Sequence, residues 1–345
     1  MQLPSLPVLD PCRKTDIQAH LDDLTKPHGA LGRLESLGSQ LAWIAGDVRP
    51  RDPDAFILTF GGDHGIARHG VSAFPQEVTP QMMANIASGG AAISVFCRAN
   101  RIQHRVVDVG VASPCDFPNV SQRNVLRGTA DPLAGPAMTR QQAEATLQAG
   151  IDEVAALPDP GFSLLGLGEM GIANSAVAAM LVTVFTGIGP EASVGPGTGV
   201  HGQALDHKLE VIKQVLARHH PDPKDPIGVL AAVGGAEFGA MAGAMLAGAS
   251  RGWAVLVDGY IAGAAALVAL ALDPKLKDFL VWSHRSAEPG AAKLLETLAL
   301  EPVLAFNLRL GEGTGAALAV PILRCACAMM REMATFSSAG VSQRS

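Results

Sequence analysis

Short apolar segments, each followed by a glycine-rich or polar turn and then by a helical stretch, recur along most of this chain. Runs of this kind are typical of buried strands. Parallel strands need a crossover helix between them, so the alternation predicts an α/β fold: a three-layer, mostly parallel, Rossmann-like sheet flanked by helices. We expect the strands at residues 56–60, 104–107, 162–167, 227–233, 254–257, 279–282 and 303–307. Almost all of the polar turns then lie on one side of the sheet.

The stretch at residues 302–317 places a carboxylate at one of these turns. Its apolar run predicts a buried strand, and the chain then breaks at the sequence GEGTG, residues 311–315, before a helix-like run. This order puts Glu312 at the carboxyl end of a strand, where open α/β sheets bind ligands. Glu312 could instead only charge the first helical turn, where acids favour the helix dipole. The glycines on either side favour close approach by a ligand.

Composition narrows the class of partner. The 345 residues are 48% hydrophobic, which is ample for a large core. Acidic residues outnumber basic ones, 32 to 26, with no basic block, which argues against nucleic acid and anionic membranes. The five cysteines contain no C-x-x-C pair and predict reduced thiols of a cytoplasmic protein. Prolines near the start interrupt any signal-peptide core, so we expect no export.

Two stretches, residues 227–249 and 253–272, are apolar enough to suggest membrane spans. Each carries a carboxylate near its middle, Glu237 and Asp258, which a lipid environment disfavours. A strand followed by a tightly packed Gly/Ala helix explains the same residues. We therefore favour a protein with no membrane partner, with a membrane transporter as an alternative.

Both ends of the chain have a helical pattern. Residues 16–24, 31–44 and 321–334 carry apolar side chains near helical spacing. These segments predict a small helical domain, residues 1–50 plus 321–345, beside a large α/β catalytic domain at 51–320. Residues 112–140 are proline-rich and predict an irregular surface excursion.

Two glycine loops are candidate anion sites. The sequence GLGEMG, residues 166–171, matches the dinucleotide fingerprint, but the acidic residue expected about 20 positions later is missing from any strand. A helix start that binds one phosphate is still a reasonable interpretation, with Gly171, Asn174 and Ser175 offering N–H and small polar groups. The second loop, VGPGTG at 194–199, precedes Lys208. Two interpretations fit it equally well: a site for a phosphate or carboxylate, and a plain turn followed by a solvated lysine.

Histidines and carboxylates show no metal-binding pattern. Asp63, His64 and His284 have no H-x-H or H-x-x-x-H spacing around them, so we expect no metal. The chain also lacks G-x-S-x-G and a Ser-His-Asp order. Local motifs therefore favour a site built from carboxylates and glycine loops.

Taken in order, the motifs resemble a known family. They are K-P at 26–27, G-x-LGRLE at 29–35, GDHG at 62–65, GVS-x-FP-x-EVT at 70–79, GEMGI at 168–172, GTG at 197–199 and LRLGEGTG at 308–315. Together they resemble the nicotinate-nucleotide–dimethylbenzimidazole phosphoribosyltransferases, which make the lower ligand of cobalamin. The resemblance covers about residues 26–331. Ala173 and Ser175 depart from it, because the family usually has Gly and Thr there.

The resemblance implies a reaction. The family moves 5-phosphoribose from nicotinate mononucleotide to 5,6-dimethylbenzimidazole, with inversion at C1′, and releases α-ribazole 5′-phosphate and nicotinate. The entering benzimidazole must lose a proton, for which one carboxylate as general base is enough. By resemblance Glu312 is that base, and Glu169 assists electrostatically. No cofactor is required, and a cytoplasmic homodimer is expected.

The resemblance also implies the substrate contacts. Phosphate and nicotinate candidates lie in the glycine loops, and a flat apolar slot for the base lies between the 72–82 segment and the GEMG and GEGTG loops. The candidates are Ser72, Phe74, Gln81, Met82, Met170, Gly171, Asn174, Ser175, Gly197, Thr198, Gly199, Lys208, Leu310, Gly311 and Gly313. A non-catalytic nucleotide-binding module is the other alternative, and which bases the slot accepts stays open.

Overall fold

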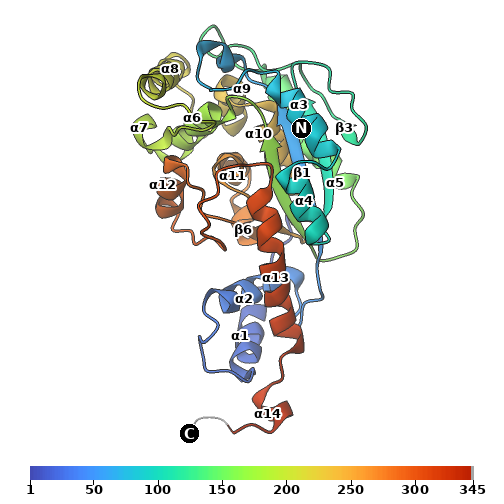
Figure 1. Ribbon diagram of the computed structural model, residues 1–345. Coiled ribbons are helices and arrows are strands. Elements are labelled where there is room, and N and C mark those ends of the chain that lie inside the picture. The colour runs from blue at the N-terminus through green and yellow to red at the C-terminus, as the bar shows by residue number, and fades with distance from the viewer. Residues whose placement is uncertain (343–345) are drawn as a thin grey trace.

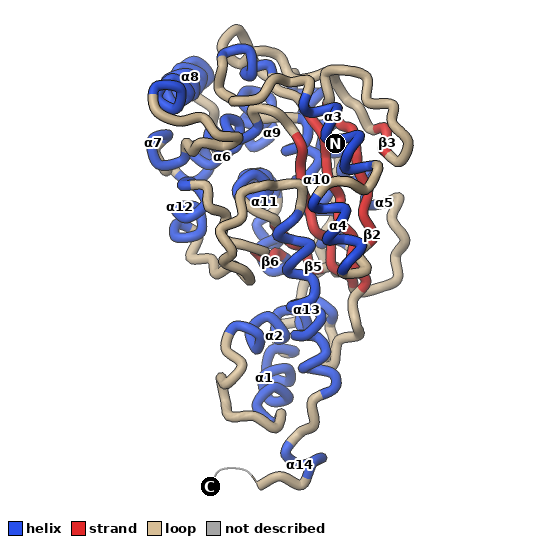
Figure 2. Tube along the Cα trace, in the orientation of Figure 1, coloured by secondary structure: helices blue, strands red, loops and turns tan. Residues whose placement is uncertain are grey.

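The computed structural model describes residues 1–342 and contains one parallel six-stranded sheet with the order β3-β2-β1-β4-β5-β6 (Figures 1 and 2). The predicted α/β class is confirmed. The strands are β1 (Asp54–Gly62), β2 (Gln103–Gly110), β3 (Val120–Gln122), β4 (Ser163–Met170), β5 (Ala254–Val257) and β6 (Leu280–Trp282).

Helices cover both faces of the sheet. On β4, Gly248 of α10 meets Leu165, whereas Ala316 of α13 meets Gly166. Neighbouring strand residues point to opposite faces, so α10 and α13 lie on opposite sides of the sheet. Helices α3 and α4 pack on the sheet beside α13, and α5 packs on α10 (Figure 1).

The helices are α1 (Arg13–Asp23), α2 (Arg33–Ala45), α3 (Val78–Ala87), α4 (Ala92–Ala99), α5 (Arg140–Ala155), α6 (Asn174–Thr186), α7 (Pro190–Ser193), α8 (Gln203–His219), α9 (Pro226–Val233), α10 (Ala236–Ser250), α11 (Tyr260–Leu272), α12 (Pro289–Thr297), α13 (Thr314–Glu332) and α14 (Phe336–Ala339). Residues 1–342 also include two 3₁₀ helices, η1 (Gly65–His69) after β1 and η2 (Pro274–Phe279) before β6.

The predicted strand at residues 227–233 is wrong, because these residues form helix α9. Its start signals are local: the Asp225 side chain accepts a hydrogen bond from the Gly228 N–H, and Pro226 occupies the first turn. Both are preferred at helix N-termini. The helix is short and almost fully buried, so its sequence is as apolar as that of a buried strand.

The predicted buried strand at residues 303–307 is also wrong. This segment makes only one isolated parallel bridge, between Leu304 and His284, and Phe306 is 65% exposed. Glu312 therefore does not end a strand; it lies in the loop between this segment and α13. The segment runs beyond β6 at the edge of the sheet, where a single bridge replaces a ladder.

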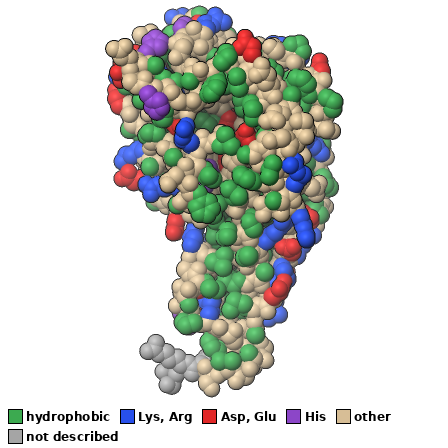
Figure 3. Space-filling model, viewed as in Figure 1, with side chains coloured by type: hydrophobic (Ala, Val, Ile, Leu, Met, Phe, Trp, Pro, Cys, Tyr) green, Lys and Arg blue, Asp and Glu red, His purple; other side chains and the backbone are tan. Residues whose placement is uncertain are grey.

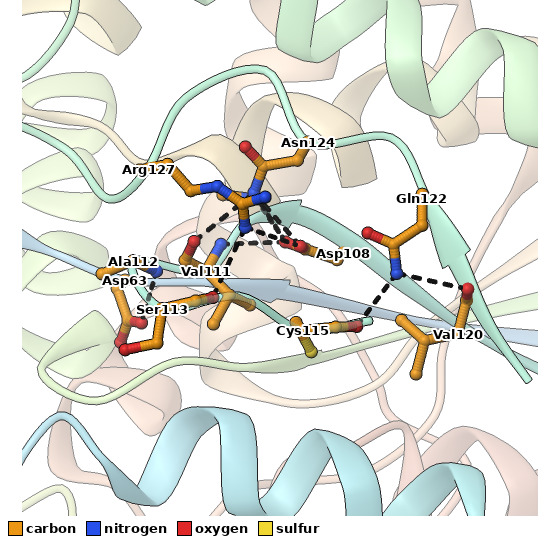
Figure 4. A network of polar contacts seen from close by, with 11 residues as sticks. Asp63, Asp108, Val111, Ala112, Ser113, Cys115, Val120, Gln122, Asn124 and Arg127 are labelled. Carbon is orange, nitrogen blue, oxygen red and sulfur yellow. Dashed lines mark hydrogen bonds and ion pairs between the residues drawn. The ribbon is translucent and has the colours of Figure 1, made fainter. Parts of the chain in front are cut away.

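Residues 112–140 are mostly irregular, as predicted, but they include the edge strand β3. A polar network anchors the excursion to the sheet (Figure 4). The Asp108 carboxylate accepts hydrogen bonds from the Val111 N–H and from Asn124, and Asp63 accepts one from the Ala112 N–H. Asp63 directly follows β1, and Asp108 lies near the end of β2. The network therefore fixes the excursion to the carboxyl edge of the sheet.

Helices α1 and α2 and the last part of α13 form a helical bundle at one end of the molecule, whereas the N-terminus itself lies level with α3, toward the other end (Figure 1). Ile17 and Leu21 of α1 pack with Met329 and Met330 of α13 in a separate apolar cluster. Helix α13 runs without a break through Pro321, from the sheet into this bundle. The predicted domain boundary at residue 321 thus falls inside one helix, and residues 343–345 of the predicted unit lie outside the described residues.

Among residues 1–342, one helix is long and apolar enough to cross a membrane by length and composition: α13, with 61% of the relevant window buried within the fold. The two stretches that suggested membrane spans form α9 with α10 and β5 with α11. Both lie in the core around the sheet.

Candidate functional site

A cavity of about 450 Å³ lies beyond the carboxyl ends of β4, β5 and β6. This is the edge at which parallel α/β sheets bind ligands. Its lining comes from the predicted loops and from elements far apart in the chain: Phe74, Val78, Met82, Glu169, Met170, Gly171, Ile172, Asn174, Ser175, Gly197, Thr198, Asp258, Gly259, Tyr260, Ile261, Ala262, His284, Ser286, Glu288, Arg309, Leu310, Gly311 and Glu312.

Glu312 is 4% exposed and is fixed through its backbone. Its carbonyl accepts a hydrogen bond from Thr59 Oγ1 at 2.8 Å, and its N–H donates to the Glu169 carbonyl at 3.2 Å. Gly311, Glu312 and Gly313 all have positive φ, at 88°, 64° and 95°. Glycine takes this left-handed conformation without strain, so the flanking glycines allow the loop to turn Glu312 toward the cavity.

The Glu312 carboxylate lies at the start of α4. Its Oε2 accepts a hydrogen bond from the Ile93 N–H at 3.3 Å, one of the donors that a helix N-terminus leaves free. Burial raises the pKa of Glu312; the Ile93 bond opposes the rise and the Asp258 carboxylate adds to it. A carboxylate with a raised pKa is a stronger base and therefore a better proton acceptor.

Glu169 shares the cavity with Glu312. It stands near the end of β4, and a Cβ added at Gly311 would lie 2.2 Å from Glu169 Oε1, so the Glu169 side chain lies against the backbone of the Glu312 loop. Asn174 donates a hydrogen bond to Glu169 Oε2. Burial raises the pKa of Glu169 to about 8, with further rises from Glu237 and Asp258. Around neutral pH a large share of Glu169 side chains therefore carries a proton.

The dinucleotide fingerprint is part of a strand rather than a phosphate loop. Gly166 and Gly168 lie inside β4, and only Gly171 lies in the turn that follows. A Cβ at Gly168 would lie 2.1 Å from the backbone carbon of Glu312, so this glycine lets the Glu312 loop rest directly on the strand. Its role here is close packing between two backbones, which removes the basis for a dinucleotide site.

The helix after this turn begins with a strained residue. Ala173 is the N-cap of α6 and has a φ of 75°. Residues with a Cβ rarely adopt this left-handed conformation, whereas glycine does so freely. Asn174 and Ser175 then point from the first turn of α6 into the cavity lining.

Lys208 lies behind the second glycine loop. Its Nζ donates to Ser175 Oγ and to the Gly195 carbonyl, both at 2.9 Å, and the residue is 0% exposed. Burial lowers the pKa of Lys208 to about 8, while the Glu288 carboxylate opposes that fall. The ammonium group thus holds Ser175 and the glycine loop at 194–199 in place through these two hydrogen bonds, but it does not itself line the cavity.

Most of the predicted site residues do line the cavity, and five do not. Ser72 contacts the rim through Thr198 Oγ1 at 3.0 Å, Gln81 is exposed on α3, and Gly313 packs on Gly168 and Ile57. Gly199 and Lys208 lie outside the lining as well. At the mouth, Phe74 and Leu310 are 52% and 59% exposed, an apolar rim for a flat ligand.

Sequence reasoning missed the polar wall formed after β5 and β6. Asp258, His284, Ser286 and Glu288 line the cavity and are buried. Asp258 accepts a hydrogen bond from the Ala316 N–H at 3.0 Å, and this bond ties it to the first turn of α13. The signal that could have found these residues is their position, directly after two predicted strands on the polar edge of the sheet.

Among the described residues, no group of three or more His, Cys, Asp or Glu side chains has a metal-binding arrangement. His64 instead pairs with Glu237 at 2.6 Å, and His284 lies 3.8 Å from Asp258.

The whole chain is similar to known proteins. A family model described as a phosphoribosyltransferase matches residues 6–341. The nicotinate-nucleotide–dimethylbenzimidazole phosphoribosyltransferase of Pseudomonas fluorescens is 46% identical over 343 residues, 97% of this chain and 98% of that protein. The enzyme of the same name from Cupriavidus necator is 46% identical over 346 residues, 100% of both chains. A crystal structure of CobT from Thermus thermophilus superposes with a TM-score of 0.93 at 43% identity, covering 97% of this chain and 100% of that one.

Proposed function

This chain belongs to the nicotinate-nucleotide–dimethylbenzimidazole phosphoribosyltransferase family, and on that premise we propose that Glu312 is the general base of the transfer that its cavity carries out. The reaction moves 5-phosphoribose from nicotinate mononucleotide to 5,6-dimethylbenzimidazole, giving α-ribazole 5′-phosphate and nicotinate. The observation that carries the assignment is the buried Glu312 carboxylate, held at the cavity by a rigid backbone next to a second carboxylate, Glu169.

The proton balance needs only one base. The pyridinium of nicotinate mononucleotide takes the electrons of its C1′–N bond and leaves as nicotinate without a proton donor. One benzimidazole nitrogen forms the new bond to C1′ from the opposite face, which inverts the configuration to α. Its second nitrogen then gives its proton to Glu312, and the product leaves uncharged at the ring. General-base catalysis of this kind contributes about 10²–10⁴-fold.

Glu169 acts on the ribose. As C1′ gains positive charge, an ionised carboxylate beside it stabilises the oxocarbenium-like transition state, and low polarity strengthens that interaction. The raised pKa of Glu169 means that this help grows as the pH approaches 8. Turnover should therefore rise on the alkaline side of neutrality.

The glycine loops receive the phosphate and the nicotinate. Gly171, Asn174 and Ser175 offer N–H and small polar groups at the start of α6, where the helix dipole favours an anion. Gly197 and Thr198 line the same part of the cavity, with Gly197 packed directly against Ser175, and Lys208 adds its positive charge from behind Ser175. The apolar rim with Phe74, Met82, Met170 and Leu310 receives the flat base.

The remaining expectations enter the proposal from the resemblance. We propose a cytoplasmic homodimer with small-molecule substrates, and a small helical unit made by both termini beside the α/β body. The packing of α1 against α13 supports such a unit. Lys and Arg side chains are scattered over the face seen in Figure 3, which supports a protein without a nucleic-acid partner.

Two isosteric variants test the assignment. Glu312→Gln keeps the shape of the side chain but cannot take the proton, so single-turnover formation of α-ribazole phosphate should slow by about 10²–10⁴-fold. Binding of nicotinate mononucleotide, measured by calorimetry, should persist. Glu169→Gln should cost less, because its amide dipole keeps part of the electrostatic help. A Glu312→Gln chain that works within about tenfold of the parent refutes Glu312 as the base.

A further inference from the structure

A buried ion pair, His64 with Glu237, lies next to the cavity wall and takes no part in the chemistry above. His64 follows the end of β1, and Glu237 stands in the first turn of α10. His64 Nε2 and Glu237 Oε1 are 2.6 Å apart, and both side chains are 0% exposed. Removing two charged groups from water is expensive, so a pair of this kind is a weak source of stability.

Three glycines let the pair press against the cavity wall. A Cβ at Gly171 would lie 3.3 Å from both Glu237 Oε1 and His64 Nε2. One at Gly62 would lie 2.6 Å from Glu237 Oε2, and one at Gly235 would lie 2.4 Å from His64 Cε1. Gly171 itself lines the cavity, two residues after Glu169. Only a backbone without side chains therefore separates the pair from the proposed site.

The pair is held tightly but is not fully satisfied. Within the described residues, His64 Nδ1 and Glu237 Oε2 are buried without a hydrogen-bond partner. The His64 carbonyl accepts a hydrogen bond from Gln76 Nε2 at 2.9 Å, which ties it to the 72–82 segment. With few local dipoles to screen them, the charges of the pair act on neighbouring ionisable groups.

The cavity that Glu169 lines also holds the ionisable side chains of His284, Glu288 and Arg309. Glu169 is faced by Glu237 from α10, Asp258 after β5 and Glu312 before α13, and Glu237 is the first of these in its effect on the Glu169 pKa, after burial. His64 is faced by Glu237 and Asp63; burial opposes a charge on the ring, but these two carboxylates raise the His64 pKa. The ring is therefore more readily protonated than an ordinary histidine.

We propose that the His64–Glu237 pair is a positioning device for Glu169, which holds the wall at Gly171 and sets whether Glu169 is ionised during turnover. This inference rests on the proposed function, because it concerns the same site. With a protonated His64, the charge of Glu237 is compensated and Glu169 loses its proton more readily. With an uncharged residue at 64, Glu237 is uncompensated and keeps the proton on Glu169.

The two members of the pair give opposite predictions. The single-turnover rate of the parent chain should rise with pH, with the midpoint of this rising limb near pH 8. Glu169→Gln should abolish the limb. Glu237→Gln keeps a hydrogen-bond acceptor for His64 but removes the negative charge, so the limb should move down by about one pH unit. His64→Gln keeps a donor to Glu237 but removes the positive charge, so the limb should move up.

The matched control is Glu153→Gln. Glu153 is also a fully buried glutamate with cationic partners, Arg105 and Arg123, but it does not line the cavity. This variant should leave the midpoint of the limb unchanged. A parent that makes no α-ribazole phosphate refutes the proposed function, whereas an active parent whose limb is the same in both pair variants refutes only this inference.

A measurement on the unaltered pair covers the case in which neither variant folds. The carboxyl carbon of Glu169 can be titrated by NMR in the parent labelled with [¹³C]glutamate, with the signal assigned through Glu169→Gln. A midpoint near 8 shows that burial and the neighbouring carboxylates hold the proton on Glu169, which is the condition that the proposal requires. A midpoint at the ordinary glutamate value of about 4.3 overturns it.

Discussion

Gly168→Ala should disable the enzyme by displacing the backbone of the Glu312 loop, although Gly168 itself does not line the cavity. A methyl group at Gly168 would lie 2.1 Å from the Glu312 backbone carbon and 2.2 Å from the Gly313 nitrogen. Non-bonded carbon atoms settle at about 3.5–4.0 Å, so the Glu312 loop must retreat by about 1.5 Å. Both obstacles are backbone atoms, and no side chain can rotate away to relieve the contact.

Two quantities follow from this displacement. Overpacking in a close-packed interior costs about 1–3 kcal/mol, which urea unfolding would measure as a fall in the free energy of unfolding. A shift of about 1 Å in a reacting group costs about 10²-fold in rate, so turnover at saturating substrates should fall by at least about 10²-fold. Affinity for nicotinate mononucleotide should change much less, because its proposed contacts lie on other loops.

Gly248→Ala is the matched control. Its methyl group would also overpack β4, but from the other face, and would meet only side-chain ends: Leu165 Cδ2 at 2.6 Å and Val255 Cγ2 at 3.3 Å. Stability should change while turnover is largely preserved. A Gly168→Ala chain that is folded and keeps more than about a tenth of the parental turnover would show that the position of the Glu312 backbone does not limit the chemistry.

Three further outcomes are expected. Ala173→Gly should stabilise the chain by about 0.5–1 kcal/mol in urea unfolding, because relief of about 1–2 kcal/mol of left-handed strain exceeds the entropy cost of a new glycine, about 0.4–1 kcal/mol; a loss of stability would contradict this. Lys208→Ala should weaken nicotinate mononucleotide binding in calorimetry by less than a direct hydrogen bond to a charged group contributes, about 1.5–3 kcal/mol, because Lys208 acts through Ser175 and does not line the cavity; unchanged affinity would remove Lys208 from the anion site. Burial raises the pKa of Glu153, but hydrogen bonds from Arg105 and Arg123 outweigh it and hold the pKa below its ordinary value of 4.5. The ionised Glu153 therefore stabilises the fold above pH 4.5, and this stabilisation is lost as the pH falls through the lower folded pKa. Acid unfolding followed by circular dichroism should show a shallower pH dependence in Glu153→Gln.

The sheet was predictable because its signal is repeated. Strands β1, β2, β4, β5 and β6 each combine a short apolar run with a polar turn, and the intervening helices force a parallel arrangement. The prediction failed at residues 227–233, since a short buried helix and a buried strand have the same apolar composition. The Asp-Pro pair at 225–226 was the available signal, because it is a helix start.

The site was predictable only where a residue carries its own local signal. Glu312 could be recognised in the sequence because a glycine stands on each side of it, although the strand expected before it does not exist. What holds Glu312 instead is tertiary: Thr59 on β1 and the Glu169 backbone on β4. Asp258 and His284 are distinguished in the sequence only by their position after two predicted strands, and the pairing of β5 with β6 brings them together.

The continuous course of α13 has a mechanical consequence. Its 19 residues make a rod about 28 Å long, which starts at the Glu312 loop and ends among the helices of the two chain termini. Because the helix is continuous, a displacement of about 2 Å at its far end corresponds to a tilt of about 4° at its first turn, which adjoins the Glu312 loop. We therefore expect substitutions at Met329 or Met330, which pack with α1, to change turnover from outside the cavity.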